Sequence, residues 1–174
     1  MGYNSILLAK NLLEFPHNFG GDTLFVKKFM KKFNIYLADD DLDDRDFFIE
    51  ALQEIPLKTQ VTQFDNGVDL MDRLFLDTIL PDVVFLDLYM PIMDGFECLY
   101  DIRNFKKFND IYVVAYSSIY REREVNQLKE DGANQFLKKS SSFKGLKKML
   151  LDSLNKVKDV KADTKTSNDF TILT

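Results

Sequence analysis

Short apolar runs alternate with amphipathic segments five times along the middle of this 174-residue chain. The runs are rich in β-branched and aromatic residues and are bounded by turn residues, which indicates strands. The segments between them repeat apolar residues at three- and four-residue intervals, which is typical of helices with one buried face. Strands that alternate with helices predict a parallel sheet covered on both faces. We expect strands at 33–38, 59–64, 83–86, 111–116 and 133–137, and helices at 43–55, 68–76, 94–105, 121–130 and 142–157.

Right-handed crossovers leave few arrangements for five such units. We therefore predict an α/β fold over residues 33–158: a flavodoxin-like, doubly wound, five-stranded parallel sheet in the order 2-1-3-4-5, with five helices. Residues 1–32 show no sustained helical or strand period. We expect this N-terminal extension to be loosely packed, or not to belong to the native protein if translation begins at Met30. Residues 159–174 are mostly polar and are expected to form a flexible tail.

Composition narrows the class of protein. The formal net charge of -5 argues against direct binding of nucleic acid, because phosphate binding usually concentrates positive charge. No run approaches the roughly 18 apolar residues that a membrane span requires. The single cysteine, Cys98, cannot form an intrachain disulfide, so no oxidising compartment is needed. We expect a cytoplasmic protein.

Polar residues follow four of the five predicted strands. Asp39 and Asp40 follow the first strand, Asp87 the third, Ser117 the fourth and Lys139 the fifth. In a doubly wound fold ligands bind at the carboxyl ends of the strands, so these side chains are expected to share one edge of the sheet.

The chemistry of this set is coherent. Clustered carboxylates repel one another unless a cation lies among them, and Mg²⁺ suits one or two carboxylates together with water and a phosphate. A carboxylate can accept a phosphoryl group, and an aspartate needs no base because it is ionised near neutral pH. A lysine and a hydroxyl nearby would stabilise the phosphoryl oxygens.

Four stretches resemble the receiver domain of two-component response regulators. Residues 35–41 match an apolar strand followed by aspartates, and 87–95 (Asp-Leu-Tyr-Met-Pro-Ile-Met-Asp-Gly) match the loop that follows the acceptor. Residues 113–118 match the strand that ends in Ser or Thr, and 131–139 match the Gly-Ala stretch that leads to a lysine. The resemblance covers roughly 33–158 and implies a phosphoacceptor signalling domain rather than an enzyme.

The resemblance also implies a role for each matching residue. Asp87 would be the phosphoryl acceptor, Asp40 a direct ligand of Mg²⁺, and Asp39 a ligand through water. The backbone carbonyl of Tyr89 would be a further ligand of the metal. Lys139 would pair with the acceptor and then with the phosphoryl group.

A switch is implied as well. The Ser117 hydroxyl would bond a phosphoryl oxygen, and Phe136 would turn inward into the space that Ser117 leaves. One departure concerns the residue after Lys139, where the family commonly has a proline joined by a cis peptide. Here it is Ser140, and a cis bond before a non-proline residue costs about 2.5–4 kcal/mol.

Some residues in the same stretches are expected to be structural. Asp41 and Asp94 are predicted to cap helices. Asp43 and Asp44 fall in the first turn of a helix, where negative charge favours the helix dipole. Lys138 adjoins Lys139, and the Gly-Ala spacing favours the latter as the site lysine.

Two other classes of protein fit less well. Phosphatases that form an aspartyl phosphate usually place a second aspartate two residues after the nucleophile, where this chain has Tyr89. A pseudo-receiver that only binds partners would not need the full set of Asp40, Asp87, Ser117 and Lys139. The expected partners are therefore a histidine kinase or histidine phosphotransfer protein as donor and a separate effector protein as recipient of the signal. A relay, a phosphate sink and an allosteric output all remain open.

The expected effector surface is formed by residues 121–130, the last strand and the last helix, and the same surface would serve a homodimer formed on phosphorylation. The resemblance also implies that the side chains of Tyr89 and Ile119 flank the path of an attacking water. Both are bulky, so we expect slow loss of the phosphoryl group.

Overall fold

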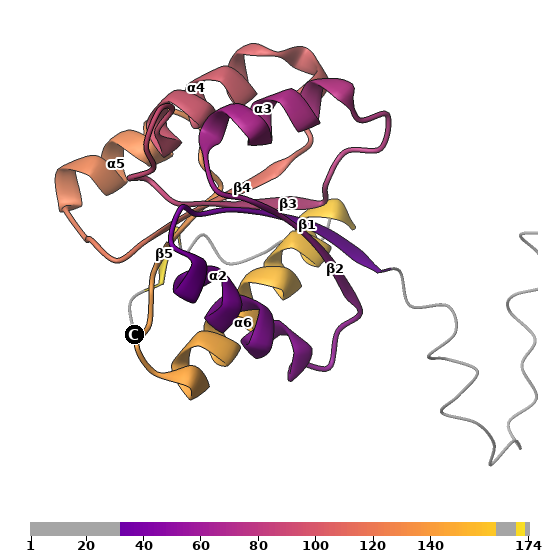
Figure 1. Cartoon of the computed structure of the whole chain (residues 1–174), viewed down its shortest axis with the longest axis vertical. Coiled ribbons are helices and arrows are strands. Elements are labelled where there is room, and N and C mark those ends of the chain that lie inside the picture. Colours follow the sequence, from indigo (N-terminus) through magenta and orange to yellow (C-terminus); the bar gives the residue numbers. More distant parts are fainter. Residues whose placement is uncertain (1–31, 163–169, 173–174) are drawn as a thin grey trace, which may run out of the picture. The chain divides into compact units, whose positions relative to one another are not determined.

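Six parallel strands form one sheet in the order β2-β1-β3-β4-β5-β6 (Figure 1). The computed structural model describes residues 32–162 and 170–172. Its first five strands reproduce the predicted order 2-1-3-4-5. The strands are β1 (Phe33–Ala38), β2 (Thr59–Phe64), β3 (Val83–Leu86), β4 (Tyr112–Ser117), β5 (Gln135–Lys138) and β6 (Thr171–Ile172).

The helices lie in two layers, with α3, α4 and α5 on one face of the sheet and α2 and α6 on the other (Figure 1). All five were predicted, and their ends agree with the sequence pattern within a few residues. A short 3-10 helix, η1, was not predicted. The helices are α2 (Leu42–Gln53), α3 (Gly67–Leu76), α4 (Gly95–Asn104), η1 (Lys106–Phe108), α5 (Glu122–Glu130) and α6 (Phe143–Lys161).

The two layers enclose two cores, one on each face of the sheet. Strand β3 is buried along its whole length, and its residues alternate between the cores. Val84 and Leu86 pack with the residues beneath α3, α4 and α5, whereas Val83 and Phe85 pack with those beneath α2 and α6. This is the pattern of a parallel strand covered on both faces, and it places the end of β3 at the centre of the sheet.

The predicted helix caps are confirmed. The Asp41 side chain accepts hydrogen bonds from the backbone amides of Asp43 and Asp44 in the first turn of α2. Asp94 and Glu97 form a capping box at the start of α4. Gly132, just after α5, has a φ of 95°, a left-handed conformation that glycine adopts at little cost.

The end of the chain differs from the prediction in two ways. Helix α6 continues to Lys161, whose amino group lies 2.8 Å from a carboxylate oxygen of Asp82 and so holds the last turn against the sheet. Residues 171–172 add the strand β6 to the edge of β5, so the sheet has six strands instead of five. The apolar side chains of Phe170 and Ile172 drive this pairing by packing against the two cores. A uniformly flexible tail from residue 159 is therefore wrong for these positions.

The predicted N-terminal extension lies, except for residue 32, outside the described residues. Within the part that the structure describes, no helix is long and apolar enough to span a membrane.

Candidate functional site

Backbone hydrogen bonds fix where the polar residues leave the sheet. The Asp87 N–H donates to the carbonyl of Ala38 over 2.8 Å, so Asp87 stays in register with β1 one residue past the end of β3. The Asp39 N–H donates to Phe64 over 3.0 Å and extends the pairing of β1 with β2 in the same way. Backbone hydrogen bonds thus anchor both aspartates of the candidate site to the sheet.

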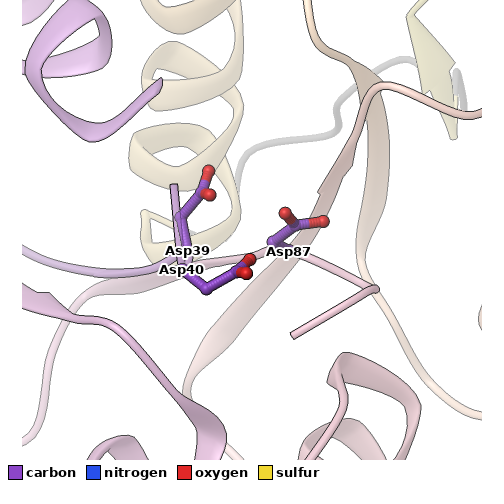
Figure 2. Close-up of side chains that lie close together, drawn as sticks. All are labelled: Asp39, Asp40 and Asp87. Atoms are coloured by element: carbon purple, nitrogen blue, oxygen red, sulfur yellow. The ribbon is translucent and has the colours of Figure 1, made fainter. Parts of the chain in front are cut away.

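Three carboxylates gather at this edge, as predicted. Each of Asp39, Asp40 and Asp87 offers an oxygen, and these oxygens lie within 4.8 Å of one another. Figure 2 shows the side chains of the two consecutive aspartates after β1 beside that of Asp87 after β3. Asp39 and Asp87 are buried and Asp40 is exposed, so the cluster opens to solvent on one side.

Lys139 supplies the positive charge next to this cluster. Its backbone N–H donates to the carbonyl of Ser117 over 2.8 Å, which extends the pairing of β4 with β5 as far as the site. Its Nζ lies 2.7 Å from Asp39 Oδ2, 2.8 Å from Asp44 Oδ2 and 2.9 Å from Asp87 Oδ2. Burial disfavours the charged ammonium, but the carboxylates outweigh burial and raise the pKa of Lys139 above its usual range. Of the two adjacent lysines, Lys139 is the one whose ammonium contacts the carboxylates.

Asp39 has a different electrostatic environment. Its side chain is fully buried, and burial raises its pKa to about 6 even though Lys139 acts in the opposite direction. Lys139 approaches Asp39 Oδ2 as an ion pair, yet this oxygen accepts no well-aligned hydrogen bond from any described residue. A buried carboxylate oxygen without a directed donor is costly, and it suits a site that a cation or its bound water completes.

Gly95 explains why α4 can begin so close to the acceptor loop. A Cβ at this position would lie 2.2 Å from the backbone oxygen of Asp87 and 2.8 Å from Leu88 Cα. The Gly95 N–H donates to the Leu88 carbonyl over 3.2 Å. Only glycine permits this approach, which ties the first turn of α4 directly to the backbone of Asp87.

Tyr89 connects the acceptor loop to α5. Its hydroxyl donates to Glu124 Oε2 over 2.7 Å and accepts from Arg121 Nη1 over 3.0 Å. The guanidinium of Arg121 also lies 5.9 Å from the centre of the tyrosine ring. The single donor of the hydroxyl is thus directed to Glu124 of α5 rather than to a water over the carboxylates. Ile119, the second residue expected to flank the path of water, is exposed.

The two predicted switch residues are both buried. The Ser117 hydroxyl accepts a hydrogen bond from the Ile119 N–H over 3.3 Å. Phe136 is 0% exposed, and its ring contacts that of Tyr120 with a centroid distance of 5.8 Å. We expected Phe136 to turn inward on phosphorylation, and in this structure the ring is already buried, beside Tyr120 and next to the strand β6.

Two residues near the site were not predicted to belong to it. Asp44 forms the ion pair with Lys139, although we assigned it to the helix dipole alone. Arg45 donates from Nη1 to the carbonyl of Asp39 over 2.6 Å and so supports the backbone of the acidic pair. Their signal in the sequence was their place in the first turn of α2, which begins two residues after Asp40 and stays near the strand ends.

The residue after Lys139 is Ser140, where the family commonly has a proline joined by a cis peptide. Every peptide bond in the described part of the chain is trans, including the one between Lys139 and Ser140. The Ser140 hydroxyl accepts from the backbone N–H of Ser142 over 3.2 Å, which shapes the loop that leads into α6.

Solved structures share this fold. The phosphorylated cyanobacterial phytochrome response regulator RcpA superposes with a TM-score of 0.68 at 23% identity, covering 75% of this chain and 96% of that one. The Mn²⁺-bound form of the response regulator Rcp1 gives a TM-score of 0.63 at 25% identity, covering 77% and 97%.

Proteins of similar sequence also include two-component response regulators. The two-component response regulator ARR6 of Arabidopsis thaliana is 32% identical over 136 residues, which cover 73% of this chain and 72% of that protein. The sensor histidine kinase CheAY of Helicobacter pylori is 25% identical over 108 residues, which cover 62% of this chain but only 13% of the kinase. A protein-glutamate methylesterase of Clostridium acetobutylicum matches over 37% of its length. This chain thus spans a minor part of some of its relatives.

The model of the response regulator receiver domain matches residues 35–151, which include the acidic pair, the acceptor loop, Ser117 and Lys139. The chain therefore belongs to the response regulator receiver domain family, whose members are signalling domains of two-component systems.

Proposed function

We propose that Asp87 accepts a phosphoryl group from a histidine kinase or histidine phosphotransfer protein, with Mg²⁺ in the acidic cluster, and that the change is passed to a partner protein. One observation carries the proposal: Asp87 lies beside two further carboxylates and 2.9 Å from the Lys139 ammonium, at the carboxyl edge of the sheet. This is the arrangement that phosphoryl transfer to a carboxylate requires, because charge is stabilised on both the nucleophile and the phosphoryl oxygens. We also propose a cytoplasmic location, where such donors are found.

The residues present fit a divalent ion. Asp40 and Asp87 would bind it directly, Asp39 would act through water, and the Tyr89 carbonyl would complete the set. The support comes from the buried Asp39 oxygen that lacks a directed donor and from three oxygens within 4.8 Å. When bound, Mg²⁺ supplies positive charge that offsets the carboxylates and the phosphoryl group.

In the transfer step, a carboxylate oxygen of Asp87 forms a bond to phosphorus while the bond from phosphorus to the donor's imidazole nitrogen breaks. The electron pair of the broken bond leaves with the imidazole. The Lys139 ammonium would stabilise the phosphoryl oxygens, and the Ser117 hydroxyl would donate to one of them. No general base is required, because the nucleophile is a carboxylate.

The phosphorylated state should be long-lived. Water must attack in line with the bond to Asp87, past the side chains of Tyr89 and Ile119. The single donor of the Tyr89 hydroxyl is engaged by Glu124 and its oxygen accepts from Arg121, so no donor of this side chain is available to orient a water. Hydrolysis without an aligned nucleophile is slow.

We propose that the partner, or a second copy in a homodimer, binds the face formed by α5, β5 and α6. The Tyr89 bonds link the acceptor loop to the first turn of α5, which gives this face a direct connection to the site. The edge of β5 is occupied by β6, so a partner would contact β6 or displace it.

The proposal is tested by incubating the protein with Mg²⁺ and acetyl phosphate and measuring the intact mass. Wild type should gain one phosphate, and Asp87→Ala should gain none. Asp72→Ala, which removes an exposed aspartate of α3, is the matched control and should behave like wild type. Phosphate uptake by Asp87→Ala at the wild-type rate would show that the acceptor is another residue.

A further inference from the structure

Lys139 is shared among three carboxylates, of which only Asp44 lies outside the proposed acceptor and metal set. Its Nζ makes directed hydrogen bonds to Asp44 and Asp87 and an ion pair with Asp39, all between 2.7 and 2.9 Å. An ammonium has three N–H donors. Two of these donors are directed to Asp44 and Asp87, so a phosphoryl oxygen that approaches the ammonium competes with these two carboxylates.

The exposure of the three carboxylates indicates which contact yields. The side chain of Asp44 is 42% exposed, compared with 0% for Asp39 and 10% for Asp87. A buried carboxylate that loses its counter-charge is strongly destabilised. An exposed carboxylate that loses its counter-charge is stabilised by water instead. Asp44 also lies in the first turn of α2, where the helix dipole stabilises its charge without Lys139.

We infer that Asp44 is a positioning residue: it holds Lys139 in the unphosphorylated site and gives up its hydrogen bond to an incoming phosphoryl oxygen. The inference rests on the proposed function of Asp87. The Nζ also lies 5.4 Å from the centre of the Tyr116 ring, a contact that does not depend on Asp44. Asp44 therefore competes with the phosphoryl group for Lys139, while Asp39 and Asp87 are sufficient to keep the ammonium in the site.

The test is the second-order rate constant for phosphorylation by acetyl phosphate at saturating Mg²⁺, followed by intact mass. Asp44→Asn should be faster than wild type by about two- to fivefold, the factor that corresponds to a partly exposed ion pair. Asp44→Glu, which restores a carboxylate in the same turn, should return the rate toward wild type. Asp43→Asn removes the same charge from the adjacent exposed residue and should change the rate by less than about twofold, because its charge is screened.

Thermal unfolding of the same variants separates this role from a structural one. Asp44→Asn and Asp43→Asn should have similar thermal midpoints, whereas a merely structural Asp44 would lower the midpoint without raising the rate. An Asp44→Asn rate no higher than that of Asp43→Asn overturns the inference while the role of Asp87 stands. If wild type gains no phosphate at all, the proposed function fails and the inference fails with it.

Discussion

Gly95→Ala should damage both the stability and the chemistry of the domain, because this glycine touches the backbone of Asp87, the proposed acceptor. The new Cβ would lie 2.2 Å from the Asp87 oxygen and 2.8 Å from Leu88 Cα, and both neighbours are backbone atoms that cannot rotate away. An ordinary contact needs about 1 Å more, so either α4 or the acceptor loop must move by that amount. Overpacking of this kind costs about 2–3 kcal/mol.

A loss of this size should lower the thermal midpoint by about 10 °C in a domain of this length. In urea unfolding followed by circular dichroism, the loss should lower the midpoint. The slope of the unfolding free energy against urea concentration should stay unchanged. A displacement of about 1 Å at the reacting group can cost about 100-fold in rate, so phosphate uptake from acetyl phosphate should fall sharply even where the protein is fully folded.

Gly145→Ala is the matched control, since it makes the same change at another helix start. The nearest atom to its new Cβ would be the Ser140 hydroxyl at 2.7 Å, which can rotate, and the next lies at 3.5 Å. Turning that hydroxyl away also gives up its hydrogen bond from the Ser142 N–H, so the stability of Gly145→Ala should fall by about 1 kcal/mol, less than that of Gly95→Ala. If both variants unfold at the wild-type urea midpoint, the close approach of α4 to Asp87 does not constrain the fold and the reasoning is wrong.

Three further results are expected. In the metal-free protein, Asp39 keeps its proton up to about pH 6 when folded but releases it near 3.8 when unfolded, so stability should fall as pH rises through this window. Urea midpoints measured across the window should show this decline, and Asp39→Asn should flatten it; an unchanged slope would contradict the assignment. Truncation after Ala162 removes β6 and leaves the Phe136 N–H without the Phe170 carbonyl that accepts from it over 2.8 Å. It should cost about 1–2 kcal/mol and increase self-association through the bare edge of β5, measured by denaturation and light scattering, and an unaffected midpoint would mean that β6 contributes nothing. Finally, Tyr89→Asn combined with Ile119→Glu should speed the decay of phosphorylated protein after removal of the donor by about tenfold or more, because both new side chains can orient a water. Decay at the wild-type rate would refute the shielding argument.

Much of this protein could be predicted from local patterns in its sequence. The two hydrophobic periods gave the strands and helices of the central domain, since each pattern reflects burial within a few neighbouring residues. The caps at Asp41 and Asp94 and the turn at Gly132 follow from the same short-range chemistry. The positions of Asp87 and Lys139 at strand ends also followed, because all strands of a parallel sheet end at the same edge.

The tertiary structure alone decided which side chains meet across that edge. Lys139 reaches Asp44 across 95 positions, and Tyr89 reaches Glu124 across 35. These contacts depend on the rotation of α2 and α5 about their axes and on side-chain rotamers, none of which leaves a periodic signal. The pairing of β6 with β5 is of the same kind, because a run as short as Phe170 to Ile172 becomes a strand only when an open sheet edge and two cores lie beside it. Local sequence therefore determined what each segment is, and packing between distant segments determined which carboxylates share the lysine and what covers the last strand.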